Sequence, residues 1–190
     1  MNITLFGGSF NPPHIGHQIV VNQALELIPD VDEVWLVPDF KSTYKDKKLI
    51  DTKHRLAMTK MLENHVIKLC SCNIDHKTSG HTIETVDILK GKHPEHTFSF
   101  LMGSDQLEGF KKWGEWERLL KEIEFFVYPR SSYPMKPLLS NMSPLLHPLQ
   151  VISNISSTMV RSRLENDLSV KHLMPPKVAE YVEKHKLYQG

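Results

Sequence analysis

The chain has 190 residues, a size typical of one domain with a substantial core, so we treat residues 1–190 as a single domain. Its formal net charge of +1 argues against binding of long nucleic acid, although a local basic patch for a small anion remains compatible with it. No apolar stretch is long enough for a membrane span or a secretion signal, so no membrane association is expected. Cys70 and Cys72 have no further zinc ligands at finger spacing, which favours reduced thiols and a cytoplasmic location.

Short apolar runs alternate with amphipathic ones along the chain. This pattern predicts an α/β fold, a Rossmann-like open and mainly parallel sheet with helices on both faces. We expect strands at 2–6, 33–37, 66–71, 97–102, 124–128 and 149–152. We expect helices at 14–28, 53–64 and from 82, two short helices within 104–121, and further helices at 158–168 and 176–186. The proline-rich segment 129–148 is expected to lack a regular helix and to be either functional or disordered.

The segment from Gly7 to His17, with the sequence GGSFNPPHIGH, follows the first predicted strand and leads into the first predicted helix. Its glycines permit a tight turn, and unpaired N–H groups at the helix N-terminus favour an anion such as phosphate. His17 falls on the apolar stripe of that helix and is expected to face the end of the sheet. A zinc site on the two histidines is the weaker alternative, because no third ligand is nearby in sequence. A phosphate at ~4 Å favours protonation by about 4 kcal/mol, so bound nucleotide is expected to hold at least one imidazole protonated.

Other polar clusters also follow predicted strands. They lie at 38–48, at Gly103-Ser104-Asp105, at Pro129-Arg130 and at Ile155-Ser156-Ser157-Thr158. The carboxyl ends of parallel strands share one edge, which is where such folds bind ligands, so we expect one common site. The serines and threonine open a helix, where they and Arg161 suit phosphate oxygens, although an ordinary capped helix with a solvated arginine explains the same residues. Residues 151–190 are thus expected to add a phosphate-binding helix and a C-terminal helix to the sheet and helices formed by residues 1–150.

The segment 41–55 carries five lysines and one arginine against two aspartates, a net charge of +4. Such charge is usually solvated surface, but a lysine beside a phosphate pocket could contact a triphosphate. Composition does not choose which lysine.

The segment from Gly7 to His17 resembles the signature of the HxGH nucleotidyltransferase superfamily, and the chain resembles nicotinate-nucleotide adenylyltransferases in particular. The similarity extends through Met102 to Asp105, Trp113, Pro129-Arg130, the Ile155 to Thr158 motif with Arg161, and the ending Leu187-Tyr188. The resemblance implies adenylyl transfer from ATP to nicotinate mononucleotide, giving deamido-NAD and pyrophosphate. Mg²⁺ would enter with ATP, without protein ligands of its own.

The same resemblance implies roles for individual residues. Catalytic roles fall on His14, His17, Lys45 and Arg161. ATP binding falls on Gly7, Gly8, Ser9, Phe10, Gly16, Gly103, Asp105, Ile155, Ser156, Ser157 and Thr158. Mononucleotide binding falls on Thr82, Trp113 and Arg130, although core packing is an alternative for Trp113.

Two departures from the family pattern leave alternatives open. Tyr44-Lys45 replaces a common His-Lys pair, and His81 stands where relatives tend to have tyrosine, beside the expected pyridine pocket. Preference for the acid over nicotinamide mononucleotide therefore stays open, as do a pantetheine-phosphate adenylyltransferase, a cytidylyltransferase and a non-catalytic nucleotide-binding module. The sequence is also compatible with a homo-oligomer.

Overall fold

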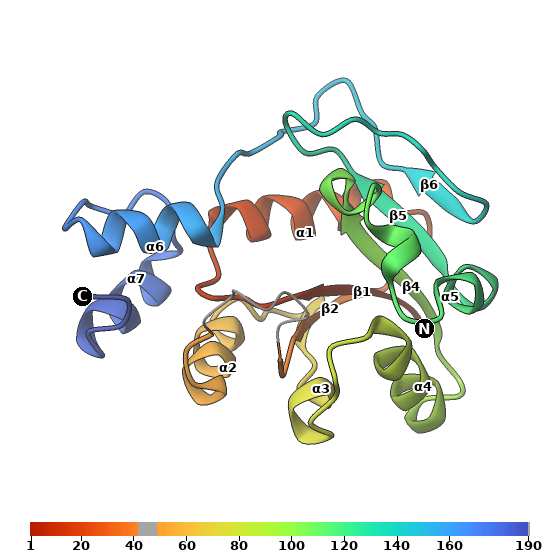
Figure 1. Ribbon diagram of the computed structural model, residues 1–190, viewed down its shortest axis with the longest axis horizontal. Coiled ribbons are helices and arrows are strands. Elements are labelled where there is room, and N and C mark those ends of the chain that lie inside the picture. The colour runs from red at the N-terminus through yellow and green to blue at the C-terminus, as the bar shows by residue number, and fades with distance from the viewer. Residues whose placement is uncertain (42–48, 190) are drawn as a thin grey trace.

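The computed structural model describes residues 1–41 and 49–189, and within these residues the strands form one six-stranded sheet (Figure 1). The strand order is β3-β2-β1-β4-β5-β6, and every neighbouring pair is parallel. The strands are β1 (Asn2–Gly8), β2 (Glu33–Pro38), β3 (Ile67–Leu69), β4 (Thr97–Gly103), β5 (Glu124–Tyr128) and β6 (Met142–Pro144). The strand order reverses between β1 and β4, the position where open parallel sheets form their ligand crevice.

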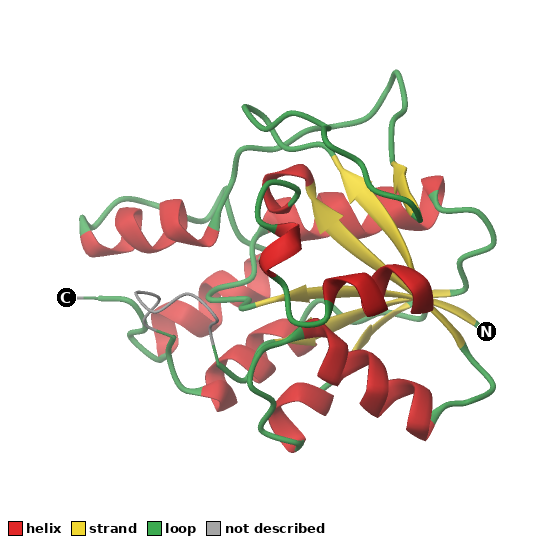
Figure 2. Ribbon diagram, turned by 45° about the vertical axis from the view of Figure 1, so that its right-hand side comes forward, coloured by secondary structure: helices red, strands yellow, loops and turns green. Residues whose placement is uncertain are grey.

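Helices cover both faces of this sheet (Figure 2). The α-helices are α1 (Ile15–Leu27), α2 (Thr52–Lys60), α3 (Cys72–Asp75), α4 (Thr82–Lys92), α5 (Trp116–Glu122), α6 (Ser157–Glu165) and α7 (Pro176–Lys184). Two 3₁₀ turns, η1 (Ser104–Gln106) and η2 (Phe110–Lys112), follow β4. The predicted Rossmann-like α/β fold is therefore confirmed.

The core consists of two apolar clusters on opposite faces of the sheet. Successive strand residues point to opposite faces, so Leu101 joins the cluster beneath α1, α2, α6 and α7, whereas Phe100 joins the cluster beneath α3, α4 and α5. Burial on both faces explains why β1, β2, β4 and β5 appear in the sequence as nearly continuous apolar runs.

The strand predicted at 149–152 is wrong. The sixth strand is β6, inside the segment predicted as a loop, and it pairs with β5 from Phe125 opposite Met142 to Val127 opposite Pro144. The apolar side chains of 149–152 are exposed, and the backbone of Val151 bonds to side chains instead of a strand. Its N–H donates to Gln23 Oε1 over 2.8 Å, and its carbonyl accepts from Gln23 Nε2 and the Tyr128 hydroxyl. The Ile155 to Thr158 motif therefore does not follow a strand.

The predicted helices are found with small shifts in their ends. Asp51 caps α2, since its side chain accepts from Lys53 N–H, and 104–121 is broken into short pieces as expected. The short helix α3 was not predicted. Among the described residues, no helix has both the length and the apolar character that crossing a membrane requires.

Candidate active site

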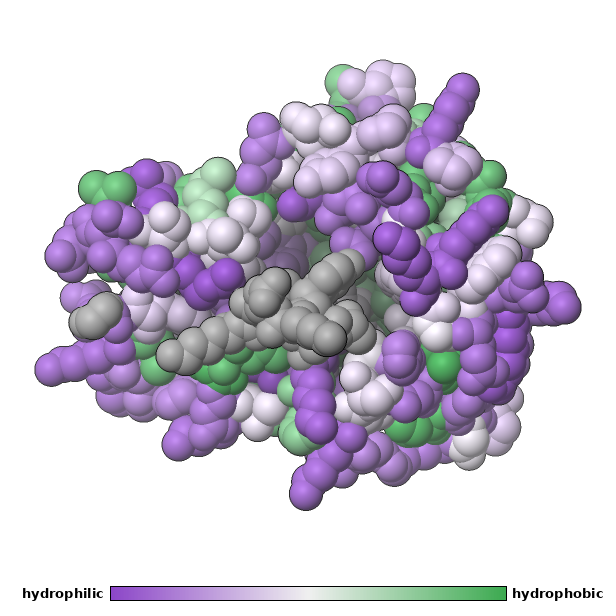
Figure 3. All heavy atoms as spheres, in the orientation of Figure 1, coloured by the Kyte–Doolittle hydropathy of each residue, from purple (hydrophilic) through white to green (hydrophobic). Residues whose placement is uncertain are grey.

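A cavity of about 600 Å³ opens at the carboxyl ends of β1 and β4, where the strand order reverses. The surface seen in Figure 3 is hollowed near its centre, and hydrophilic side chains prevail around the hollow. Most residues predicted for the site line this cavity, namely Gly7, Gly8, Ser9, Phe10, His14, Gly16, His17, Thr82, Gly103, Asp105, Trp113, Arg130, Ser156, Ser157 and Thr158. Ile155 and Arg161 do not line it, and Lys45 lies outside the described residues.

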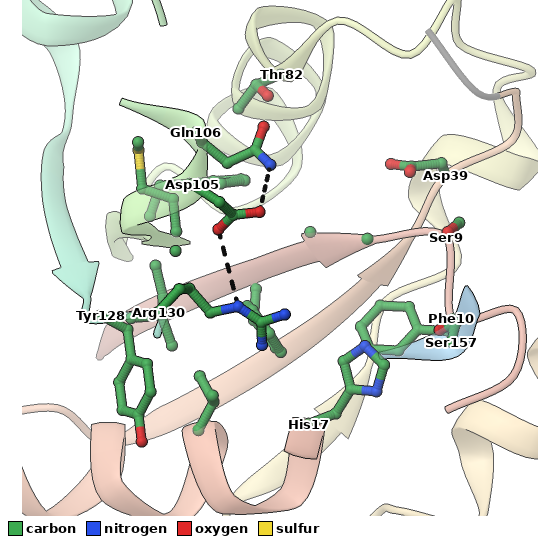
Figure 4. Close-up of a pocket in the computed structure, with 18 of the residues that line it drawn as sticks. Ser9, Phe10, His17, Asp39, Thr82, Asp105, Gln106, Tyr128, Arg130 and Ser157 are labelled. Carbon is green, nitrogen blue, oxygen red and sulfur yellow. Dashed lines mark hydrogen bonds and ion pairs between the residues drawn. The ribbon is translucent and has the colours of Figure 1, made fainter. Parts of the chain in front are cut away.

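Helices α1, α4 and α6 begin at this cavity. Their first turns contribute His17, Thr82 and Ser157 to its wall, and Figure 4 shows these side chains around a common space. Each helix N-terminus presents unpaired N–H groups and about half a positive charge. The cavity is therefore suited to a ligand with several separate anionic groups.

His14 and His17 are held together at the start of α1. The backbone N–H of His14 donates to Nδ1 of His17 over 3.0 Å, and the two rings lie 3.7 Å apart between centroids. Because Nδ1 of His17 accepts this bond, its proton is on Nε2, which can donate to a ligand. A Cβ on Gly16 would lie 2.8 Å from Nδ1 of His14, so the ring can occupy this place only if residue 16 is glycine.

The His14 ring is buried, with 4% of the residue exposed. Burial, and secondly the positive charge of Arg130, lowers the pKa of His14 to about 3. Its Nδ1 has no hydrogen-bond partner among the residues that the structure describes. Before a ligand binds, His14 is therefore neutral at pH 7.

The first turn of α6 is tied to the loop that precedes α1. The Ser157 hydroxyl donates to the carbonyl oxygen of Pro12 over 2.8 Å, and Arg161 Nη1 donates to that of Asn11 over 2.8 Å. Arg161 Nη2 also donates to the Thr158 hydroxyl over 3.2 Å, so the guanidinium lies at the end of α6 that faces the cavity. Ser156 caps the helix by accepting from Met159 N–H, as predicted. These bonds join segments about 145 positions apart in sequence.

Arg130 and Asp105 face each other across the cavity wall (Figure 4), with Nε and Oδ1 4.0 Å apart. Asp105 also accepts from Gln106 Nε2 over 3.1 Å. The hydroxyl of Ser104 accepts from the Arg130 backbone N–H over 2.9 Å and fixes the start of this segment. A Cβ on Gly103 would lie 2.2 Å from Oδ1 of Asp105, so a larger residue at position 103 would displace the Asp105 carboxylate.

The cavity wall also contains Thr82 and Trp113. The Trp113 ring packs on Phe110 and Phe100, with centroids 5.1 and 5.9 Å away, and it also lines the cavity. Trp113 therefore packs against the core and also lines the cavity. His81, the N-cap of α4, lies close to Gly114 on the same wall, where a Cβ on residue 114 would be 2.9 Å from Nδ1 of His81.

Arg55 is a site-supporting residue that the sequence analysis missed. It is fully buried in α2, and its guanidinium donates to the backbone carbonyls of Ser9, Asp39, Phe40 and Ile50. These carbonyls belong to the loops after β1 and β2 and to the segment leading into α2. The signal was present, because Arg55 lies on the same helical stripe as the buried Met58 and Thr59. Asp39, which lines the cavity, was likewise not singled out.

Comparison with known proteins places these features in a class. A family model described as Cytidylyltransferase-like matches residues 5–163. The fold and the site thus define a nucleotidyltransferase of the cytidylyltransferase-like class.

Individual relatives narrow this assignment. The chain is 33% identical over 193 residues to a probable nicotinate-nucleotide adenylyltransferase of Flavobacterium johnsoniae, with full coverage of both chains. It is 33% identical to a probable enzyme of the same name from Bacillus pumilus, covering 99% of this chain and 98% of the relative. The structure of Plasmodium falciparum nicotinic acid mononucleotide adenylyltransferase complexed with NaAD matches with a TM-score of 0.82 and 25% identity, covering 98% and 97% of the two chains. The chain belongs to the nicotinate-nucleotide adenylyltransferase family.

Proposed function

We propose that this protein transfers the adenylyl group of ATP to nicotinate mononucleotide, forming deamido-NAD and releasing pyrophosphate. The observation that carries this proposal is the opening of the N-termini of α1, α4 and α6 into one cavity. The substrates carry a triphosphate, a phosphate and a pyridine carboxylate, and each anionic group suits a helix N-terminus. In the reaction the mononucleotide phosphate attacks the α-phosphate of ATP, and pyrophosphate leaves in line.

His14 and His17 are proposed to stabilise the charge that develops on the α-phosphate. The neutral state of His14 and the Nδ1 bond of His17 favour neutral imidazoles, with His17 donating through Nε2–H. A bound phosphate charge would raise the pKa of His14, but from a starting value of about 3, well below neutrality. We therefore propose neutral imidazoles in place of the protonated one that the sequence led us to expect. Fixed N–H donors stabilise the transition state without reorganisation of solvent.

The β- and γ-phosphates are proposed to bind at the start of α6. Ser157, Thr158 and Arg161 offer hydroxyl, backbone N–H and guanidinium donors there, and Arg161 lies at this helix end through its bond to Asn11. Lys45 is proposed to assist the departing pyrophosphate, on the basis of its match to the family motif alone.

The mononucleotide is proposed to bind between Arg130 and the N-terminus of α4. Trp113 would stack on the pyridine ring, and the backbone N–H groups beside Thr82 would donate to its carboxylate. Within residues 1–41 and 49–189 no side chain caps these N–H groups, and a helix N-terminus favours a carboxylate over a neutral amide by about 0.3–1 kcal/mol. This supports the acid over nicotinamide mononucleotide as the preferred substrate.

The cavity also fits Mg²⁺ arriving with ATP. Mg²⁺ takes one or two carboxylates together with phosphate oxygens, and Asp39 and Asp105 line the cavity. When bound, the ion neutralises charge on the phosphates and orients them. Cys70 and Cys72 are free thiols, which supports our proposal of a cytoplasmic location.

A substrate panel tests the proposed reaction. Pyrophosphate release is measured with ATP or CTP as donor, and with nicotinate mononucleotide or pantetheine phosphate as acceptor. We expect release only with ATP and nicotinate mononucleotide. Release with CTP or with pantetheine phosphate would assign another reaction of the class, and ATP binding without any release would indicate a non-catalytic nucleotide-binding module.

A further inference from the structure

The loop between α4 and β4 gathers His93, Glu95 and His96 at the amino-terminal edge of the sheet, at the opposite end of β4 from the cavity. His93 Nδ1 lies 3.7 Å and His96 Nε2 3.3 Å from Oε1 of Glu95. One ligand-capable atom from each residue lies within 4.8 Å of the other two. The N-terminus is at the same edge, where Thr97 N–H donates to the carbonyl of Met1.

We propose that these three side chains bind a divalent transition-metal ion, with Zn²⁺ as the best match. Bonds of about 2.0–2.2 Å at tetrahedral angles place neighbouring ligand atoms about 3.4 Å apart. The separations of 3.3 and 3.7 Å between the Glu95 carboxylate oxygen and the two imidazole nitrogens agree with this spacing. Two imidazoles and one carboxylate favour zinc and its neighbours in the transition series over Mg²⁺ or Ca²⁺, which prefer oxygen ligands alone.

Packing holds the two imidazoles in place. Their rings are stacked with an interplanar angle of 2° and centroids 5.3 Å apart. The Trp35 indole lies edge-on against both rings, 5.5 Å from that of His93 and 6.4 Å from that of His96.

One feature limits the expected affinity. Imidazoles that bind metals usually donate their second N–H to an acceptor, and loss of that bond weakens metal binding by about 10–100-fold. His96 Nδ1 is buried without a hydrogen-bond partner among the described residues. We therefore expect affinity about 10–100-fold below that of a site in which both second N–H groups are bound. Bound metal would tie the end of α4 to the start of β4 and raise the melting temperature.

The test uses the purified full-length chain after removal of metal with a chelator. Zn²⁺ binding is measured by calorimetry, and Ni²⁺ binding by quenching of Trp35 fluorescence. We expect saturable binding in both measurements, weakened at least tenfold by Glu95→Gln, whose side chain is 60% exposed and does not support the core. His172→Gln, which changes an exposed histidine outside the cluster, should leave binding unchanged. Trp35→Phe should abolish the Ni²⁺-dependent quenching but not the calorimetric signal.

Comparison of Glu95→Gln with the unchanged chain isolates this loop from metal bound elsewhere, including at His14 and His17. Equal Zn²⁺ affinity in the two proteins would overturn the proposal, and so would the absence of saturable binding up to millimolar Zn²⁺. In either case the three residues would form only an ion-pair cluster. The adenylyl transfer rate, measured in parallel, should not differ between the two proteins.

Discussion

The backbone N–H of His14 donates to Nδ1 of His17 over 3.0 Å, so the first histidine of the pair fixes the tautomer of the second. The proton of His17 is therefore expected on Nε2, and ¹⁵N NMR of the imidazole should report this Nε2–H form at pH 7. A ring with protons on both nitrogens would contradict the proposed neutral donor.

Replacing His17 by alanine removes that donor. We expect kcat to fall by about 10²–10³-fold, the usual cost of losing one oriented hydrogen-bond donor in a transition state. Thermal unfolding of the variant should stay cooperative. The control is His172→Ala, an exposed histidine away from the cavity, which should retain full turnover. Near-normal turnover of His17→Ala would refute the role given to this residue.

Gly16→Ala should displace the His14 ring, because the new Cβ would lie 2.8 Å from Nδ1 and 2.9 Å from Cε1 of that ring. We expect a roughly 10–100-fold loss in kcat/KM, since small misplacements of catalytic groups are costly. Gly91→Ala in α4 is the matched control, because nothing lies within 4 Å of its Cβ position. That variant should keep full activity and gain about 0.5–1 kcal/mol of stability. Equal activity of the two variants would show that a glycine at position 16 is not needed to place the His14 ring.

Arg55→Leu should remove the donor from the carbonyl oxygens of Ser9, Asp39, Phe40 and Ile50, which are buried or partly buried. We expect the free energy of unfolding to fall by roughly 2–5 kcal/mol, measured by urea denaturation. Arg55→Lys should recover only part of this loss, because an ammonium group cannot reproduce the fork of the guanidinium. Lys60→Leu at the exposed end of α2 provides the control. A loss below about 1 kcal/mol in Arg55→Leu would mean that the hydrogen bonds of the Arg55 guanidinium contribute little to stability.

The lowered pKa of His14 predicts a specific pH dependence of stability. Between pH 6.5 and 3 the unfolded chain binds a proton at this residue and the folded chain does not, so His14 makes the folded state less stable as the pH falls. The contribution approaches about 1.4 kcal/mol per pH unit. The free energy of unfolding of His14→Gln, measured from pH 7 to 4.5, should decrease less steeply than that of the unchanged chain. Identical slopes would show that His14 titrates normally.

The sequence predicts most of the fold because four strands are buried on both faces and their apolar runs are nearly continuous. It fails at β6, which is short and contains Pro144, and at 149–152, where Val151 and Ile152 are apolar but exposed. The Gln23 side chain that binds Val151 comes from a position 128 residues away. The residue pattern around Val151 therefore cannot predict this interaction.

The cavity residues were predicted largely because they follow strand ends or match a family motif. Arg55 was missed because it stands in a lysine-rich segment, where its charge indicates solvated surface. Only the folded chain brings the carbonyls of Ser9 and Asp39 to it. The neutral state of His14 was missed for the same reason, since burial is a property of the assembled site.

The most direct measurement of the central claim is steady-state kinetics with ATP and each of the two mononucleotides. The arrangement at the N-terminus of α4 predicts a higher kcat/KM for nicotinate mononucleotide than for nicotinamide mononucleotide, with deamido-NAD and pyrophosphate formed in equal amounts. A higher kcat/KM for the amide would contradict the assignment.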